Sequence, residues 1–207
     1  MEKKLMNYDT LLKVTRGIVM SKDPQKMANL IVKSVKDALG IKGSTLFLFN
    51  RKTNELEIAA STGLSDNYLN KGPLSSIHSI ASSLKDGPVA ICNAWEDPRM
   101  QYPEEAYKEG IASILSVPII VRENPIGALR VYTSETWEVT LEDVNFVQAL
   151  AQIAGMALEM SRLYKGLKGS IEILKAKRDP KTLKSKKWTP YESVPLNISG
   201  GRPAMQL

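Results

Sequence analysis

The chain has 207 residues, a formal net charge of +6, and 43% hydrophobic against 24% charged residues, which is typical of a globular domain with an appendage. No apolar run approaches the roughly 18 residues that span a bilayer, and the N-terminus has no signal-peptide core, so we expect a cytoplasmic protein. The single cysteine, Cys92, excludes an internal disulfide, CxxC redox chemistry and a structural zinc site built from thiolates.

The net charge belongs to the C-terminal tail. Residues 1–174 hold 20 Lys/Arg and 20 Asp/Glu, whereas residues 175–207 hold 8 and 2, a difference of +6. We expect a domain with dimerisation helices over residues 1–165, then a helix extension and a basic, disordered tail over residues 166–207. The aromatic and proline-containing stretch 188–198 predicts a linear motif for a protein partner. The basic residues also suit nonspecific binding of nucleic acid or anionic membrane, and a merely solvated tail is the alternative.

The N-terminal third predicts two helices and a hairpin. Apolar residues at helical spacing predict a first helix over residues 3–20. A second helix begins at Asp23–Pro24, which supplies an N-cap and a first-turn proline, and it ends at Gly40. Two strands, Ser44–Asn50 and Glu55–Ser61, flank a polar turn and predict a β-hairpin.

The middle of the chain predicts shorter elements. A helix is expected over residues 74–85, a short strand over 89–92 and another short helix over 103–109. A second hairpin follows, with strands over 112–121 and 126–134. The proline in its first strand predicts a bulge or a gap in the hydrogen-bond ladder.

The closing helix is the strongest sequence signal. It begins with a near capping box, Thr140 with Asp143, and its apolar pattern runs past Tyr164. Most of its circumference is apolar, and one set of residues follows the 4,3 alternation of a coiled coil, which predicts a homodimer; a fully buried helix in a monomer is the alternative. The predicted seam comprises Phe146, Leu150, Ile153, Ala157, Met160, Tyr164 and Leu167.

The order and spacing of short motifs across residues 8–165 resemble the GAF family of sensor domains. These motifs are Ser44–Phe49, Thr62–Gly63, Gly87–Val89, Asp97–Arg99, Ser113–Ile119, Ile126–Leu129 and Ala151–Ala154. The resemblance implies an α+β fold with an antiparallel sheet of five or six strands. It also implies that the terminal helices cover one face and that short irregular helices cover a small-molecule pocket on the other.

Strand alternation predicts which side chains face such a pocket. Leu46, Leu48, Leu129 and Val131 suit the helix-covered side. The candidate floor comprises Thr45, Phe47, Phe49, Ala59, Ser61, Ala128, Arg130 and Tyr132. The candidate walls, in the covering segment, are His78, Ser79, Ile80, Trp95, Met100, Tyr102, Ala106, Tyr107 and Ser113. For each aromatic residue an ordinary core position is the alternative.

The ligand signatures of several GAF relatives are incomplete here. Asn70–Lys71 is present, but the Phe, Asp and Glu of the cyclic-nucleotide set do not follow at suitable spacing. Cys92 lacks the neighbouring histidine of bilin-binding members, and no second cysteine resolves an oxidised one as in the methionine sulfoxide reductases. His78, the single histidine, is a conceivable haem ligand or base, but a plain polar or pocket-lining role is favoured. The residues therefore argue against cyclic nucleotide, bilin and haem, and leave the ligand unknown.

The sequence also lacks the patterns of common enzymes, since it has no recognisable nucleophile triad, no Walker-type glycine loop and no HExxH. We therefore interpret the chain as a non-catalytic, dimeric small-molecule sensor with no metal site, which signals to an output protein in trans. A ligand-free structural dimeriser or adaptor is the alternative.

Overall fold

The computed structural model describes residues 12–13, 15–16, 23–50, 52–53, 55–72, 74–75 and 87–177. The chain separates into two units, Met1–Leu167 and Lys168–Leu207. Within the first predicted helix, the four described residues are helical, and the rest of that helix lies outside the described residues. Of the predicted tail, residues 175–177 are described and helical, and residues 178–207, with the aromatic motif, lie outside the described residues.

The first long helix, α2 (Pro24–Leu39), has the ends that the sequence predicts. The Asp23 side chain accepts a hydrogen bond from Gln25 N at 3.1 Å, as an N-cap does. Gly40 ends the helix in the left-handed conformation, with φ of 59°, where a side chain would be strained.

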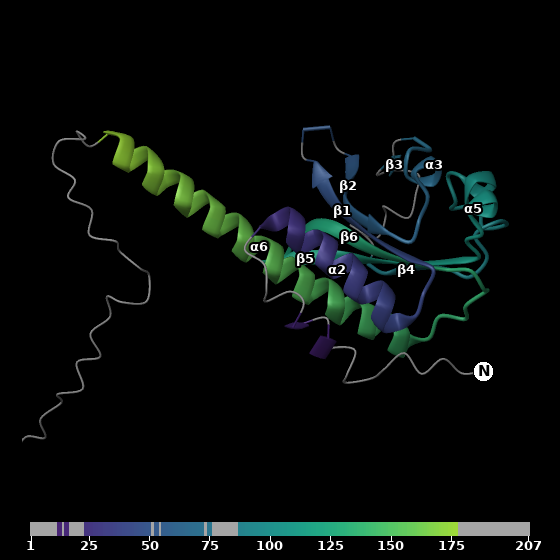
Figure 1. The fold of residues 1–207 in the computed structure, drawn as a ribbon. Helices are drawn as coiled ribbons and strands as arrows, with labels where there is room; N and C mark the ends of the chain where they lie inside the picture. The colour runs from purple at the N-terminus through teal and green to yellow at the C-terminus, as the bar shows by residue number, and fades with distance from the viewer. Residues whose placement is uncertain are drawn as a thin grey trace, which may run out of the picture. The chain divides into compact units, whose positions relative to one another are not determined.

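A six-stranded sheet forms the centre of the first unit (Figure 1), which confirms the predicted α+β class. All its pairings are antiparallel, in the order β3-β2-β1-β6-β5-β4. The strands are β1 (Gly43–Asn50), β2 (Glu55–Thr62), β3 (Leu74–Ser75), β4 (Val89–Ile91), β5 (Ser113–Val121) and β6 (Asn124–Thr133).

Strand β3 corrects one prediction. Leu74 and Ser75 were expected to open a helix, but they pair with Leu56 and Glu55 of β2. The remainder of that predicted helix, residues 76–85, lies outside the described residues. A strand forms because the edge of β2 offers free backbone groups, and the local sequence pattern contains no information about that neighbour.

Two register shifts interrupt the sheet. Leu46 pairs with Ala60, but Phe47 pairs with Ile58, so Ala59 is an extra residue in β2. Ala59 packs against the helix-side core instead of joining the pocket floor as predicted, because the bulge shifts the alternation of β2. The other shift lies between Ile119 and Ile120, next to the proline that predicted an irregularity.

One face of the sheet carries the main core. Helix α2 and the part of α6 (Leu141–Lys177) up to Leu158 cover this face (Figure 1). The sheet contributes apolar side chains that alternate along its strands, and we call this surface the helix-covered face. Its buried sheet residues are Leu46, Ala60, Leu115, Val117, Ile119, Leu129 and Val131.

The start of α6 has the predicted capping box. Thr140 N donates to Asp143 Oδ2 at 3.0 Å, and Asp143 N donates to Thr140 Oγ1 at 3.2 Å. Trp137 Nε1 also donates to Asp143 Oδ2 at 3.2 Å, which ties the preceding loop to the same carboxylate. Local hydrogen bonding therefore determines where this helix begins.

The dimer seam predicted along α6 is only partly available. Phe146, Leu150 and Ala157 are buried in the core of their own protomer, and Ile153 packs against that core. A helix that covers a sheet needs a wider apolar stripe than a coiled-coil seam, so this part of the 4,3 pattern packs inside the protomer. The remaining seam residues, Met160, Tyr164 and Leu167, are exposed.

The opposite face of the sheet lies beneath shorter elements, among them α3 (Asp66–Leu69) and α5 (Pro103–Glu109). A small core joins this face to them and comprises Tyr68, Ile91, Ala94, Ala106, Ile111, Ile114 and Tyr132. No helix among the described residues is both long and apolar enough to cross a membrane.

Candidate functional site

The opposite face of the sheet is buried but polar. We call it the polar face and define it by Thr45 and Phe47 of β1, Ser116 of β5, and Arg130 and Tyr132 of β6. All five side chains are buried. These residues alternate with those of the helix-covered face along the same strands, as the period of two requires.

At one end of the polar face the hydroxyls of Thr45 and Ser61 form a hydrogen bond of 2.8 Å between β1 and β2. Ser61 is half-buried, and it pairs directly with Thr45 in the sheet. The structure therefore brings these two predicted site residues together on adjacent strands.

Arg130 lies at the centre of the polar face and is only 3% exposed. Its guanidinium carbon is 4.7 Å from the centroid of the Phe47 ring, and its Nε donates to Ser116 Oγ at 3.3 Å. Among the described residues, its Nη2 has no hydrogen-bond partner. The ion pairs within this part of the chain, Lys42–Glu109 and Asp97–Arg99, do not include Arg130.

Two tyrosines stand beside Arg130. The rings of Tyr68 and Tyr132 meet edge to face, with centroids 6.1 Å apart. Burial raises the pKa of both phenols, and the positive charge of Arg130 opposes this rise in each case. Both side chains therefore present neutral hydroxyls at neutral pH.

Lys71 is a second cation near this site. Its Nζ lies 3.6 Å from the centroid of the Tyr68 ring and donates to the Tyr68 carbonyl oxygen at 2.9 Å. Burial, and next the positive charge of Arg130, lower its pKa from 10.5 to about 8, while Glu105 and Glu109 act in the opposite direction. The ammonium group is thus held where its charge is poorly compensated.

Tyr102 reaches the polar face from the segment that precedes α5. It packs with Phe49 against the buried pair Phe47 and Leu56. A Cβ at Gly72 would lie 2.5 Å from the Tyr102 hydroxyl oxygen, and Gly72 has a φ of 136°, so this close approach requires glycine. Gly72 and Tyr102 therefore hold two covering loops against each other.

Several other residues predicted for the pocket lie at different positions in the structure. Met100 and Ala106 belong to the small core over the polar face, where Met100 is partly buried and Ala106 fully buried. Ala128 is buried in β6 at the position that pairs with Phe47. His78, Ser79 and Ile80 lie outside the described residues.

Ser113 was predicted as a wall residue, but it belongs to the other side. It has the same strand parity as Leu115 and Val117, which face the helices. Its Oγ donates to the Cys92 carbonyl oxygen at 2.6 Å and accepts from Trp137 N at 2.8 Å. Ser116, of opposite parity, occupies the position on the polar face.

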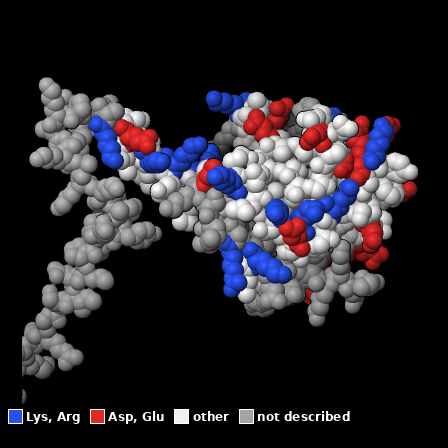
Figure 2. All heavy atoms as spheres, viewed as in Figure 1, with Lys and Arg blue, Asp and Glu red and all other residues white. Residues whose placement is uncertain are grey.

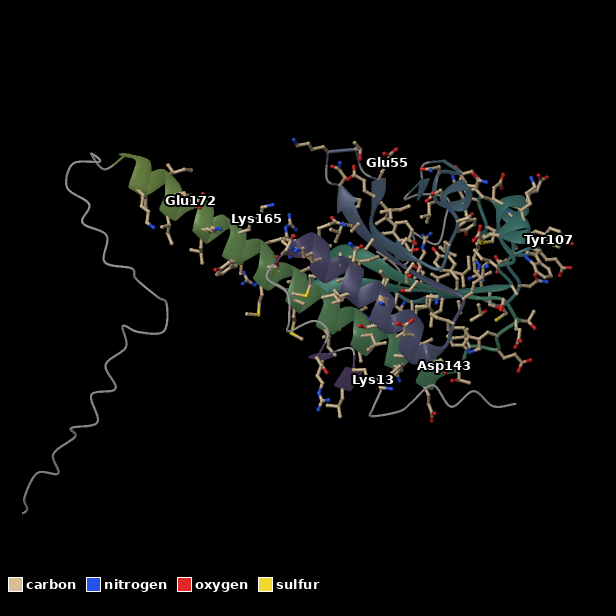
Figure 3. The ribbon with its side chains drawn as sticks, viewed as in Figure 1. Lys13, Glu55, Tyr107, Asp143, Lys165 and Glu172 are labelled. Atoms are coloured by element: carbon tan, nitrogen blue, oxygen red, sulfur yellow. The ribbon has the colours of Figure 1, made fainter. Side chains whose placement is uncertain are left out.

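Trp95 and Tyr107 also lie away from the polar face. Their rings meet edge to face at 5.3 Å, and Tyr107 is 66% exposed and points outward from α5 (Figure 3). With Pro103, Glu104 and Lys108 they line an outer hollow of about 350 Å³. A second hollow, of about 850 Å³, lies at the hairpin tips beside α6, where Phe49, Arg122 and Arg162 are among its lining residues.

Sequence reasoning missed three residues of the site. Lys71 was noted only as part of an incomplete nucleotide signature. Ser116 follows from the same alternation that placed Leu115 on the helix-covered face, so that signal was present. Tyr68 had no sequence signal, because its contact with Tyr132 joins residues 64 positions apart.

Three further observations concern the surface and the side-chain types of the described residues. On the face seen in Figure 2, the Lys/Arg and Asp/Glu side chains of the first unit are interspersed, so that face presents no patch of one sign. No group of three or more His, Cys, Asp or Glu among the described residues is arranged to hold a metal ion. Cys92 is exposed.

The GAF domain model matches residues 21–159, which is more than half of the chain. The chain therefore belongs to the GAF domain family, a family of small-molecule sensor and signalling domains, as the sequence motifs predict. No curated protein sequence matches the chain at a significant level.

Solved structures share the fold at low sequence identity. The GAF domain of a phosphoenolpyruvate-protein phosphotransferase from Coxiella burnetii is 20% identical, with a TM-score of 0.69 over 79% of this chain and 99% of that one. The GAF domain of the Acinetobacter phosphotransferase is 18% identical, with a TM-score of 0.64 over 76% and 96%. Free methionine-R-sulfoxide reductase from Neisseria meningitidis, in complex with its substrate, is 16% identical, with a TM-score of 0.63 over 77% and 95%.

Proposed function

We propose that this chain is a non-catalytic sensor domain that binds a small molecule at the polar face and signals to an output protein in trans through a helical dimer interface. The family supports the general role of small-molecule sensing and signalling. The binding site, the dimer and the route of the signal are our proposal.

The observation that carries the proposal is a buried sheet face that is not apolar. Two faces of one sheet are covered to a similar extent, yet one holds Leu and Val and the other holds Thr45, Ser116 and Arg130. A buried polar group costs free energy unless it is hydrogen-bonded. A face that served only as core would lose nothing by being apolar, so the polar residues favour a ligand.

The residue types at the polar face favour binding without catalysis. The described side chains there supply hydroxyls, aromatic rings, one guanidinium and one ammonium. Cys92 is exposed, and its carbonyl oxygen is held by Ser113 on the helix side of the sheet. Cys92 is also the single cysteine of the sequence, so the chain lacks the pair of cysteines that reductase chemistry of this fold would use.

A signal can pass directly through the sheet. Arg130 lies between Leu129 and Val131 in β6, and both neighbours belong to the core shared with α6. A ligand that shifts Arg130 would therefore move residues packed on the helix, because a densely packed core transmits strain. This arrangement supports coupling between the polar face and α6 as a difference in affinity between two states.

The exposed side of α6 supports a second copy as the partner. Met156, Met160, Leu163 and Leu167 are exposed and follow 4,3 spacing, with Tyr164 beside them. We call this set the α6 stripe. It is offset from the predicted seam, because the earlier seam positions pack inside the protomer. Large exposed apolar patches commonly mark interfaces.

Ligand binding at the polar face is tested with Ser61→Trp, which would place a large ring beside Thr45 and remove the hydrogen bond between the two hydroxyls. Small metabolites are screened by thermal shift on the purified protein, and native mass spectrometry checks for a retained ligand. We expect at least one ligand to stabilise the parent, by about 2.7 kcal/mol at a hundred times its Kd, and not the variant. An undiminished response in a folded Ser61→Trp variant contradicts the proposed site. A protein with neither a retained nor a screened ligand supports the ligand-free dimeriser.

The dimer is tested separately by light scattering. Met160→Glu with Tyr164→Glu would place like charges in the α6 stripe, and we expect a shift from dimer to monomer. Leu141→Glu is the control, since Leu141 is 75% exposed on the same helix and lies outside the stripe. A parent protein that is monomeric at micromolar concentration contradicts this part of the proposal.

A further inference from the structure

We infer that the ligand of the polar face carries an anionic group, a carboxylate or a phosphate, which binds the guanidinium edge of Arg130 and is approached by Lys71. This inference rests on the proposed function, because it names the chemical class of the ligand at the same site.

The first argument is the state of Arg130. A guanidinium stays charged at every pH at which the protein is folded, so it cannot reduce the cost of burial by losing a proton. It is 3% exposed, and its Nη2 has no hydrogen-bond partner among the described residues. A buried charged donor without a partner is strongly unfavourable, and an anion at Nη2 would remove that cost.

The second argument is the local balance of charge. Of the carboxylates whose charge reaches Lys71, Glu109 already accepts hydrogen bonds from Ser65 N and Ser65 Oγ and lies 4.0 Å from Lys42 Nζ. No ion pair among the described residues joins a carboxylate to Arg130. Arg130 and Lys71 thus form a pair of cations that repel each other, as the lowered pKa of Lys71 reflects.

The third argument is geometric. The Phe47 ring lies 4.7 Å from the guanidinium carbon and Ser116 occupies Nε, so a ligand meets the edge that carries Nη2. A planar guanidinium edge suits the two oxygens of a carboxylate or phosphate. The rings of Phe47, Tyr68 and Tyr102 can contact an apolar body attached to that group.

The test measures binding of acids and of their uncharged counterparts to the full chain. Acetate, succinate, benzoate and inorganic phosphate, each at 10 mM and pH 7, are compared with acetamide, succinamide and benzamide by thermal shift and calorimetry. We expect at least one acid to stabilise the protein and to bind at least tenfold more tightly than its amide. If no acid stabilises the protein, or if the amides bind equally well, the inference is wrong.

Two variants assign the effect to the proposed residues. Arg130→Met keeps an unbranched apolar stem and removes the charged guanidinium, and we expect it to lose at least tenfold in acid affinity. Without ligand, it should be as stable as the parent or more stable, because removing a buried charge that has no carboxylate partner offsets the loss of its bonds to Ser116 and Tyr132 and of its contact with Phe47. Arg162→Met, which removes an exposed cation of α6, is the control and should bind the acid like the parent. Strong destabilisation of ligand-free Arg130→Met would show a structural role and overturn the inference.

The pH dependence gives an independent readout. Lys71 is protonated below its pKa of about 8, so acid affinity should fall several-fold between pH 7 and pH 9 and the fall should vanish in Lys71→Met. Benzoate is a suitable ligand for this pH series, because its own carboxyl group does not titrate between pH 7 and pH 9. An affinity that does not change over this range in the parent contradicts the part assigned to Lys71. Among the described residues, the charged and titratable groups around Lys71 are Arg130, Glu105, Glu109, Tyr68, Tyr102 and Tyr132.

These outcomes separate the two proposals. If Ser61→Trp abolishes binding of a neutral ligand while Arg130→Met retains it, the site is correct and the anionic class is wrong. If an acid binds the parent and the Ser61→Trp variant with equal affinity, the site itself is wrong.

Discussion

The two faces of the sheet are buried to a similar degree, but only one of them buries a charged side chain. On the helix-covered face, Leu46, Leu129 and Val131 pack against α2 and α6 in an apolar core. On the polar face, their direct neighbours Thr45 and Arg130 are equally removed from water, yet they carry a hydrogen-bonded hydroxyl and an unpaired donor. Neutral polar atoms without a partner also occur toward the helices, at Ser44 Oγ and Gln148 Oε1. Among the described residues, however, the buried charged donor without a partner, Arg130 Nη2, lies on the polar face, where a ligand can use it.

Close approach of α6 distinguishes the helix-covered face further. A Cβ at Gly155 would lie 2.8 Å from Ile119 Cγ2 and 3.1 Å from Val121 Cγ2, so the helix touches β5 at this position. By contrast, α3 and the segment before α5 meet the polar face through the large rings of Tyr68 and Tyr102. The first face is packed for density, which is costly to disturb.

The largest predicted effect lies on the helix-covered face. Leu150→Ala would leave a cavity between α6 and the sheet, because Leu150 is fully buried there. We expect a loss of about 2–5 kcal/mol, measured by urea unfolding. Leu141→Ala, at an exposed position of the same helix, should stay within about 0.5 kcal/mol of the parent. A similar loss in both variants would contradict the contrast between core and surface along α6.

The next effect compares two glycines of α6. Alanine favours a helix by about 1 kcal/mol over glycine, but overpacking a core costs about 1–3 kcal/mol. Gly155→Ala would press on the buried, β-branched Ile119, so we expect a net loss of about 1 kcal/mol. Gly166→Ala meets no atom within 4 Å and should gain up to about 1 kcal/mol. Thermal unfolding measures both, and a gain in Gly155→Ala would show that α6 can move away from β5.

The smallest change in stability is expected at the polar face, and it is a gain, whereas the substitutions in the helix-covered core reduce stability. Lys71→Met removes a partly buried cation and should raise the stability of the ligand-free protein by less than about 1 kcal/mol, since a cation–ring contact and a hydrogen bond are also lost. This gain should depend on pH. The pKa of Lys71 is about 8 in the native state and 10.5 for an unperturbed lysine, so between these pH values the unfolded state binds more protons.

The parent therefore becomes relatively more stable as pH rises through that window, and its difference from Lys71→Met should shrink between pH 7 and pH 10. Urea unfolding of both proteins at the two pH values measures this change. A difference that stays constant would mean that the charge of the Lys71 ammonium is well compensated in the native state. That result would contradict the contrast between the two faces.

Much of the fold follows from the sequence because it depends on neighbours along the chain. The ends of α2 and the start of α6 are set by side-chain and backbone hydrogen bonds within a few residues, so Asp23, Gly40 and the pair Thr140 and Asp143 predict them directly. Strand alternation likewise assigns Leu129 to the helix-covered face, because side chains on a strand alternate with a period of two.

The sequence by itself determined the family, the order of the elements apart from α3 and β3, and which strand residues are apolar. The tertiary structure alone decided the pairing of β3 with β2, the extra residue at Ala59 and the orientation of Ser113 toward the helices. It also brought Lys71 onto the ring of Tyr68 and left Arg130 Nη2 without a partner among the described residues. The registers of neighbouring strands and the surroundings of Arg130 depend on contacts between residues distant in sequence, which no local periodicity encodes.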